Sequence, residues 1–455
     1  MSVLLTIVFG LLGLGIVIFF HELGHFIMAR LTGIPVLEFS IGMGPRLASF
    51  ARNGITYKIG MLPIGGYCKL KGEDSYKTAV LEKKEAVSFE KDDFLGAHPL
   101  KKIAISLGGP LFNVIFALLI FFCIELFGYT TYSFSNQIIL INDYISEPLY
   151  PSKIAGFQTG DRIIAINKKE TKFFSDIYTM IASSPNKPLD FTVQRGDNQL
   201  TIIASPILNK ETGAGQLGIY PWIDPVIARV EKSSAAGLAG LLPGDIIIAI
   251  DDTFIKNTQE LYNFLSLKRP QKCTIKFIRN NEERTTTLIP LYTNGNIEEL
   301  GIYWESIRIF NKANNIFEAF AKGYNQAIGT IIDTYKGIIS LFRGTNILNA
   351  IAGPARITWT VGKVTADSIA VEGFSNGLLS ALNLLALISI ALFVMNLLPI
   401  PVLDGGWIVL FIIEIFTRKP VSLKTIVRYQ QIGLLMLVLL FGLSLFSDFL
   451  FFLKQ

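Results

Sequence analysis

Four long apolar segments divide the chain, and each can cross a bilayer, which takes about 20 residues of helix. The predicted membrane helices are 1–30, 103–128, 378–404 and 431–452. The first segment has no basic residues ahead of its apolar run, and no cleavage site of small residues follows it. We therefore interpret it as a membrane span and not as a signal peptide. The expected fold class is an α-helical polytopic membrane protein.

Basic residues between these segments predict their orientation, because loops rich in Lys and Arg stay in the cytoplasm. Arg418 to Arg428 holds four basic residues and no acidic one, whereas 129–152 holds no Lys or Arg at all. We expect 405–430 and the charged stretch 72–102 to be cytoplasmic loops. Both termini and the whole region 129–377 are then extracytoplasmic.

The long region after the second span repeats itself. Ala155–Asn167 recurs as Ala239–Asp251, 84 residues later. Each copy contains Gly-Asp-x-Ile-Ile-x-Ile followed by Asn or Asp, an order typical of turn, strand and turn. The sequence thus predicts two β-rich modules, 129–222 and 223–306.

The repeated motif is similar to that of bacterial, circularly permuted PDZ domains, so we expect two α+β PDZ modules, PDZ1 and PDZ2. A second pair of segments resembles the carboxylate-binding loop of such domains, where backbone N–H groups hold a peptide C-terminus. The alternative is that each segment is only a strand with a tight turn. The residues of this pair are Leu217, Gly218 and Ile219 in PDZ1 and Leu300, Gly301 and Ile302 in PDZ2.

Two further regions have patterns of their own. Short β-like runs with glycine corners occupy 31–71 and predict one or two hairpins. Irregular backbone at membrane depth must be buried in protein or face water, so we expect a membrane re-entrant β region, with a solvated loop as the alternative. In 313–343, large apolar residues recur at spacings of three and four, which predicts an amphipathic helix. We expect it on the outer membrane face or against the bundle, with packing on a PDZ module as the alternative, and 344–377 as a connector.

Composition agrees with a membrane protein and excludes other classes. The hydrophobic fraction is 51%, and the formal net charge is +5 without a basic face interleaved with aromatic residues, so we expect no nucleic acid partner. Cys68, Cys123 and Cys273 lie far apart and are odd in number, so no disulfide framework is indicated.

The most specific chemical signal is His21-Glu22-Leu23-Gly24-His25 in the first apolar segment. Residues i and i+4 share a helix face, so both imidazoles can reach one metal ion. A glutamate beside them can polarise a water molecule, which is the pattern of zinc hydrolases. The alternative is a hydrogen-bonding histidine pair in a membrane bundle, although ionisable groups at this depth are costly without a function.

A catalytic zinc site usually has three protein ligands, and Asp404 is the candidate for the third. It ends an apolar run in which Pro399 and Pro401 break the helix. The first and third spans run in the same direction, so both motifs are expected near the cytoplasmic leaflet. The alternative role of Asp404 is that of a helix cap.

Together these motifs resemble the site-2 protease family of intramembrane zinc metalloproteases, in its bacterial branch that cleaves anti-sigma factors. The resemblance extends over nearly the whole chain and includes Gly109-Pro110-Leu111-Phe112-Asn113 and Asn396…Pro399…Leu403-Asp404-Gly405. Trp407 departs from the family pattern, in which a histidine is common. The resemblance implies one Zn²⁺ held by His21, His25 and Asp404, Glu22 as the base, and Asn396, Asn113, Tyr67 and Gly66 as substrate-binding residues.

The resemblance also implies the class of substrate and the location. We expect hydrolysis of a peptide bond within or near the transmembrane segment of single-span proteins, such as anti-sigma factors or signal peptide remnants. This would be the second step of a regulated proteolysis at the bacterial cytoplasmic (inner) membrane, with membrane lipid as the other partner. Two alternatives from other classes remain, a zinc-containing membrane transporter and a catalytically silent PDZ scaffold.

Overall fold

The computed structural model describes residues 3–453 except 76–77, 79–88, 211, 294–295, 298 and 342–351. The chain forms two compact units. The helical unit comprises Met1–Tyr129 and Asn311–Gln455, and the β unit comprises Thr130–Phe310. The long described helices all belong to the helical unit, which also contains a β-hairpin within residues 36–70.

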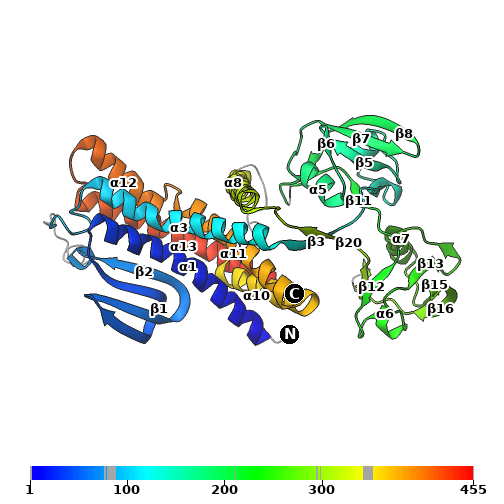
Figure 1. Ribbon diagram of the computed structural model, residues 1–455, viewed down its shortest axis with the longest axis horizontal. Coiled ribbons are helices and arrows are strands. Elements are labelled where there is room, and N and C mark those ends of the chain that lie inside the picture. The colour runs from blue at the N-terminus through cyan, green and yellow to red at the C-terminus, as the bar shows by residue number, and fades with distance from the viewer. Residues whose placement is uncertain are drawn as a thin grey trace. The chain divides into compact units, whose positions relative to one another are not determined.

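The described helices of the helical unit include four that are long and apolar enough to cross a membrane, namely α1, α3, α11 and α13 (Figure 1). These are the four apolar segments predicted from the sequence, except that the predicted end of the third helix at residue 404 is wrong, because α11 ends at Asn396. The helices are α1 (Val3–Thr32), α3 (Pro99–Phe127), α8 (Ile316–Leu341), α10 (Pro354–Glu372), α11 (Phe374–Asn396), α12 (Asp404–Thr417) and α13 (Leu423–Leu453).

Helix α1 packs closely against α3 and α10 because glycines line its contacts. A methyl group on Gly108 of α3 would lie 2.6 Å from the carbonyl oxygen of Gly24, and one on Gly10 would overlap the carbonyl of Thr358 in α10. Membrane helices associate through such small residues, which let backbones approach. The contact at Gly24 places α3 directly beside the two histidines.

Two helices were not anticipated from the sequence. Helix α10 lies in the predicted connector 344–377, of which 344–351 is outside the described residues, and α12 lies in the predicted loop 405–430. Buried Asp448 of α13 accepts hydrogen bonds from the backbone N–H groups of Gly353, Ala355 and Arg356. A carboxylate at a helix N-terminus satisfies free N–H groups and is favoured by the helix dipole, so α10 is anchored to α13.

The predicted β-like runs form one long antiparallel hairpin, β1 (Val36–Arg52) and β2 (Ile55–Leu70), that contacts α1 (Figure 1). Register shifts interrupt the ladder on both sides of Gly42 and Gly44, whose φ values are 81° and 84°. Positive φ is readily adopted only by glycine, so these residues bend the hairpin. Leu47 and Phe50 are large apolar side chains of the hairpin that are exposed.

Helix α8 packs against α3 and α11 through its small residues. Ala319 and Ala327 are buried there, and Gly323 leaves room for the backbone of Phe122. The larger apolar residues of the predicted stripe mostly point outward, so that Phe317 is 84% exposed. Because α8 lies so close to α3, the face of α8 with the small residues packs against α3. Phe342, which belongs to the predicted apolar stripe, lies outside the described residues.

In the β unit the two copies of the repeat adopt the same strand order, β6-β5-β7-β8 in the first and β14-β13-β15-β16 in the second. The first copy contains β4 (Ile138–Leu140), α4 (Pro151–Ile154), β5 (Arg162–Ile166), β6 (Lys169–Glu170), α5 (Phe174–Ala182), β7 (Leu189–Arg195), β8 (Asn198–Ala204), β9 (Ile207–Leu208), β10 (Gly215–Gln216) and β11 (Ile219–Pro221). The second contains β12 (Ile227–Val230), α6 (Ala235–Leu238), β13 (Ile246–Ile250), β14 (Thr253–Phe254), α7 (Thr258–Lys268), β15 (Cys273–Arg279), β16 (Glu282–Leu288), β17 (Tyr292–Thr293), β18 (Asn296–Ile297) and β19 (Ile302–Trp304). Strand β3 (Tyr129–Ser133) pairs with β20 (Ile307–Asn311).

The repeated Gly-Asp motif has the same structural role in both copies. The buried carboxylate of Asp161 accepts from Arg195, which also donates to the carbonyl of Gly156. Asp245 and Arg279 repeat this arrangement in the second copy. Burial of the aspartate makes the arginine necessary, because an unpaired buried charge is strongly destabilising.

Candidate active site

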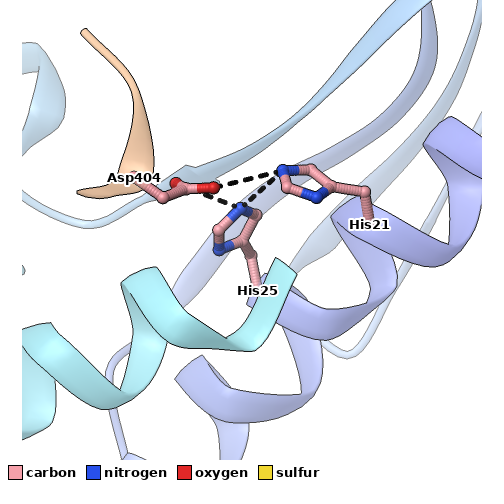
Figure 2. Close-up of side chains that lie close together, drawn as sticks. All are labelled: His21, His25 and Asp404. Carbon is pink, nitrogen blue, oxygen red and sulfur yellow. Dashed lines mark hydrogen bonds and ion pairs between the residues drawn. The ribbon is translucent and has the colours of Figure 1, made fainter. Parts of the chain in front are cut away.

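Three side chains that could hold a metal ion converge in the helical unit (Figure 2). His21 and His25 project from the same face of α1, and Asp404 projects from the first turn of α12. Nε2 of His21 lies 3.2 Å from Nε2 of His25 and 3.4 Å from Oδ2 of Asp404. Nε2 of His25 lies 3.5 Å from Oδ1 of Asp404. The two motifs, almost 380 residues apart in the sequence, therefore share one site.

The spacing of these atoms fits a tetrahedral zinc ion. Nitrogen and oxygen ligands bind zinc at about 2.0–2.2 Å, which places neighbouring ligands of a tetrahedron about 3.3–3.6 Å apart. The observed separations of 3.2, 3.4 and 3.5 Å agree with this value. Two imidazoles and one carboxylate also match the donor set of catalytic zinc sites that keep a fourth position open.

The backbone of α3 orients His25. Nδ1 of His25 lies 2.8 Å from the carbonyl oxygen of Ile105. A carbonyl only accepts, so Nδ1 carries the proton and Nε2, which faces Asp404, keeps its lone pair. Pro110 lies inside the same helix and cannot donate the usual helical hydrogen bond, which loosens the turn around it. The sequence carries no direct signal for a backbone carbonyl of this kind.

Gly109 lies at the site, although the sequence analysis named it only as part of a family motif and gave it no role. A methyl group there would lie 2.7 Å from Cε1 of His21 and 2.7 Å from Cε1 of His25. Only glycine lets α3 pass this close to both rings. The Gly-Gly-Pro sequence inside an apolar segment was the available signal, since glycine in a membrane helix often marks a close approach.

Two asparagines also contact His21. Asn113 of α3 is fully buried, and its Nδ2 lies 3.2 Å from Nδ1 of His21. Asn396 ends α11, and its Nδ2 lies 3.4 Å from Nε2 of His21, on the side of the metal-binding atoms. The structure thus places both predicted asparagines at the cluster, but on opposite sides of the imidazole.

The segment after Asn396 turns the chain so that Asp404 faces the histidines. Val402 adopts a φ of 80°, which is strained for a β-branched residue and must be held by its surroundings. Gly405 and Gly406 pack against the carbonyls of residues 397–400, where any side chain would overlap the backbone. Asp404 lies in the first turn of α12, but its carboxylate points at the imidazoles.

The remaining residues named from the sequence lie outside the three-residue cluster. A methyl group on Gly66 of β2 would lie 2.9 Å from Cγ of Glu22, so this strand passes against the glutamate. The hydroxyl of Tyr67 donates to Glu38 at 2.6 Å and accepts from Lys58 at 3.2 Å. Trp407 stacks on Phe411. Among the described residues, Glu22 is not part of the three-residue metal cluster.

The predicted ligand loops of the β modules each begin a short strand. Leu217 and Leu300 are buried in the cores of their modules. Gly218 and Gly301 have φ values of 87° and 71°, and side chains of their own modules lie against them, Tyr150 in the first and Ser234 in the second. These positions require glycine for conformation and for space.

The sequence of this chain is similar to those of known metalloproteases. A sequence model of peptidase family M50 matches residues 9–440. Proteins named "Putative zinc metalloprotease" are similar over the whole length, one from Treponema pallidum with 32% identity over 445 residues (98% of this chain, 99% of the relative) and one from Borreliella burgdorferi with 34% over 451 residues (97% and 98%). Regulator of sigma-E protease RseP of Salmonella typhimurium is 28% identical over 486 residues, which cover 99% of both chains. The chain belongs to peptidase family M50.

Proposed function

We propose that this peptidase is an intramembrane zinc metalloprotease whose catalytic zinc is held by His21, His25 and Asp404. The observation that carries the proposal is the convergence of three donor atoms from two distant helices at separations of 3.2–3.5 Å. Two of these donors lie in an apolar helix long enough to cross a membrane. The names of its relatives give zinc as the metal.

Glu22 is proposed as the general base. It follows His21 on α1, and β2 passes against its side chain. A zinc ion at the cluster would polarise the scissile carbonyl and make a water molecule acidic enough to lose a proton near neutral pH. Glu22 takes that proton and later delivers it to the leaving amine, which restores the carboxylate for the next cycle.

Asn396 is proposed to position the substrate. Its amide nitrogen lies 3.4 Å from the metal-facing nitrogen of His21, so an N–H group is available beside the reacting carbonyl. Such a donor stabilises negative charge that develops on the carbonyl oxygen during attack. Tyr67 and Gly66 are proposed to bind the substrate as part of strand β2, which contains both residues.

A helical substrate hides its carbonyls in its own hydrogen bonds, so it must unwind before attack. We propose the β1–β2 hairpin as a membrane re-entrant element that holds the unwound stretch by adding a strand to its edge. The contact of the hairpin with α1 and the position of Gly66 against Glu22 support this role. The backbone groups of the substrate are then satisfied although they lie in lipid.

The proposed substrates are single-span membrane proteins, such as anti-sigma factors or signal peptide remnants. The two β modules are proposed as extracytoplasmic PDZ domains that exclude substrates with bulky outer domains. Their equivalent sheets and the glycines at Gly218 and Gly301 support a PDZ assignment. The basic segment Arg418 to Arg428 favours a cytoplasmic position for the end of the third span, which Asp404 follows.

Cleavage of tagged single-span proteins tests the proposal. Each would be co-expressed with the wild-type chain, with Glu22→Gln, and with Glu170→Gln, which removes a surface carboxylate of the β unit. Fragments cut within the apolar segment should appear with the wild type and with Glu170→Gln. Glu22→Gln should lose at least about 100-fold in rate while its zinc content stays at the wild-type level. Undiminished cleavage by Glu22→Gln would overturn the assignment of the base.

A further inference from the structure

We propose that Asn113 is a positioning residue for His21, and that its side-chain oxygen accepts a hydrogen bond from Nδ1–H of His21 when zinc is bound. The inference rests on the proposed zinc site. The family resemblance suggested that Asn113 contacts the substrate. Here Asn113 instead holds the imidazole of His21 from its Nδ1 side.

The position of Asn113 suits this role, and its burial leaves no surface for contact with a substrate. It has no exposed surface, and its amide lies 3.2 Å from Nδ1 of His21. Its carbonyl oxygen Oδ1 is buried and has no hydrogen-bond partner, although a buried acceptor of this kind normally finds one. A half-turn of the amide exchanges oxygen and nitrogen without moving other atoms, and brings the unpartnered oxygen to the imidazole.

The chemistry of metal binding selects this orientation. A neutral imidazole carries one proton, and ligation through Nε2 requires that the proton sits on Nδ1. An NH₂ group facing Nδ1–H would set two donors against each other, whereas the amide oxygen accepts from it. The carbonyl of Ile105 already does the same for His25 at 2.8 Å. Both ligands then have an acceptor on α3 that fixes the tautomer and the ring plane.

A hydrogen bond also fixes the backbone at Asn113. Ser389 of α11 is fully buried, and its hydroxyl donates to the backbone carbonyl of Asn113 at 2.9 Å. This bond ties α3 to the helix that ends at Asn396. Ser389→Ala therefore offers a matched control, because it removes a buried hydrogen bond to the backbone of Asn113 and leaves the side chain of Asn113 in place.

Zinc affinity, measured by competition with a chelator on purified full-length protein, tests the proposal. Asn113→Leu fills the same space without an acceptor and should bind zinc about 10–100-fold more weakly. Asn113→Asp keeps an acceptor but has no NH₂ group, and should stay within about threefold of the wild type. Ser389→Ala should stay within the same range. Asn113→Ala replaces the leucine variant if that variant does not reach the membrane.

Two results would overturn the proposal. In the first, Asn113→Leu and Asn113→Ala bind zinc as tightly as the wild type. In the second, Asn113→Asp binds as weakly as Asn113→Leu, which would mean that the NH₂ group is the required partner. His21→Ala separates these results from a failure of the proposed zinc site, because it should lose the metal. Full zinc binding by His21→Ala would refute the site itself.

Discussion

Gly109→Ala should remove zinc from the site although the change adds only one methyl group. That methyl would lie 2.7 Å from Cε1 of each histidine, and still closer to Nε2 of His25, whereas ordinary contacts begin near 3.4 Å. If the rings give way, Cε1 of each must retreat by about 0.7 Å, and Nε2 of His25 by more. Metal–ligand distances in a well-formed zinc site stay within about 0.2 Å of their usual values, so the three donors can no longer meet one ion.

The alternative relaxation leads to the same outcome. If α3 moves away from α1 in place of the rings, the carbonyl of Ile105 and the amide of Asn113 move with it and release both imidazoles. Such a movement would also open the close contact between Gly108 and Gly24 and lose its packing. Loss of a ligand should weaken zinc binding at least about 100-fold, or about 2.7 kcal/mol at 25 °C.

The assay is zinc content and chelator competition on purified protein, with thermal unfolding as the check that the variant is folded. Gly15→Ala is the matched control, since it makes the same change in α1 at a position with open space around it. It should bind zinc as the wild type does. A folded Gly109→Ala variant that binds zinc with wild-type affinity would refute the reasoning that α3 shapes the site.

Three further outcomes are expected. Lys102→Met should destabilise the helical unit by about 3 kcal/mol, because it leaves the carboxylate of Glu414, whose side chain is only 11% exposed, without its partner at 2.6 Å. Exchange of both residues for Met and Leu should recover most of the loss of thermal stability. Arg279→Met should expose 223–306 to limited proteolysis in the full-length chain, because it leaves Asp245 unpaired. Arg284→Met changes an exposed pair and should not have this effect. Equal resistance of the two variants to proteolysis would contradict the role of the buried pair. A metal chelator should abolish cleavage, and added zinc should restore it; chelator-resistant cleavage would exclude a metal mechanism.

The convergence of the metal-binding residues could be predicted because it depends on two simple regularities. His21 and His25 share a helix face by the period of the helix, and the direction of the first and third spans places Asp404 at a similar depth. The first is a local property of the sequence, and the second follows from the order of the spans and the charges of the loops. The structure brings the three side chains together as this reasoning requires.

The residues that orient the site could not be predicted in the same way. Ile105 acts through a backbone carbonyl, and Gly109 acts through the absence of a side chain, so neither has a distinctive side-chain chemistry. Helix α10 carries Arg356, Lys363 and Asp367 and therefore has no apolar run of membrane length. Its place in the bundle depends on the close contact of Gly10 with Thr358, which only packing reveals.

X-ray absorption spectroscopy of the zinc-loaded protein tests the central claim most directly, together with the metal content of Asp404→Ala. The wild type should bind one zinc ion with nitrogen and oxygen ligands at about 2.0–2.2 Å, including two imidazoles and no sulfur. Asp404→Ala should lose most of the metal after dialysis. A zinc–sulfur distance of about 2.3 Å, or full zinc retention by Asp404→Ala, would place the ion elsewhere and contradict the account.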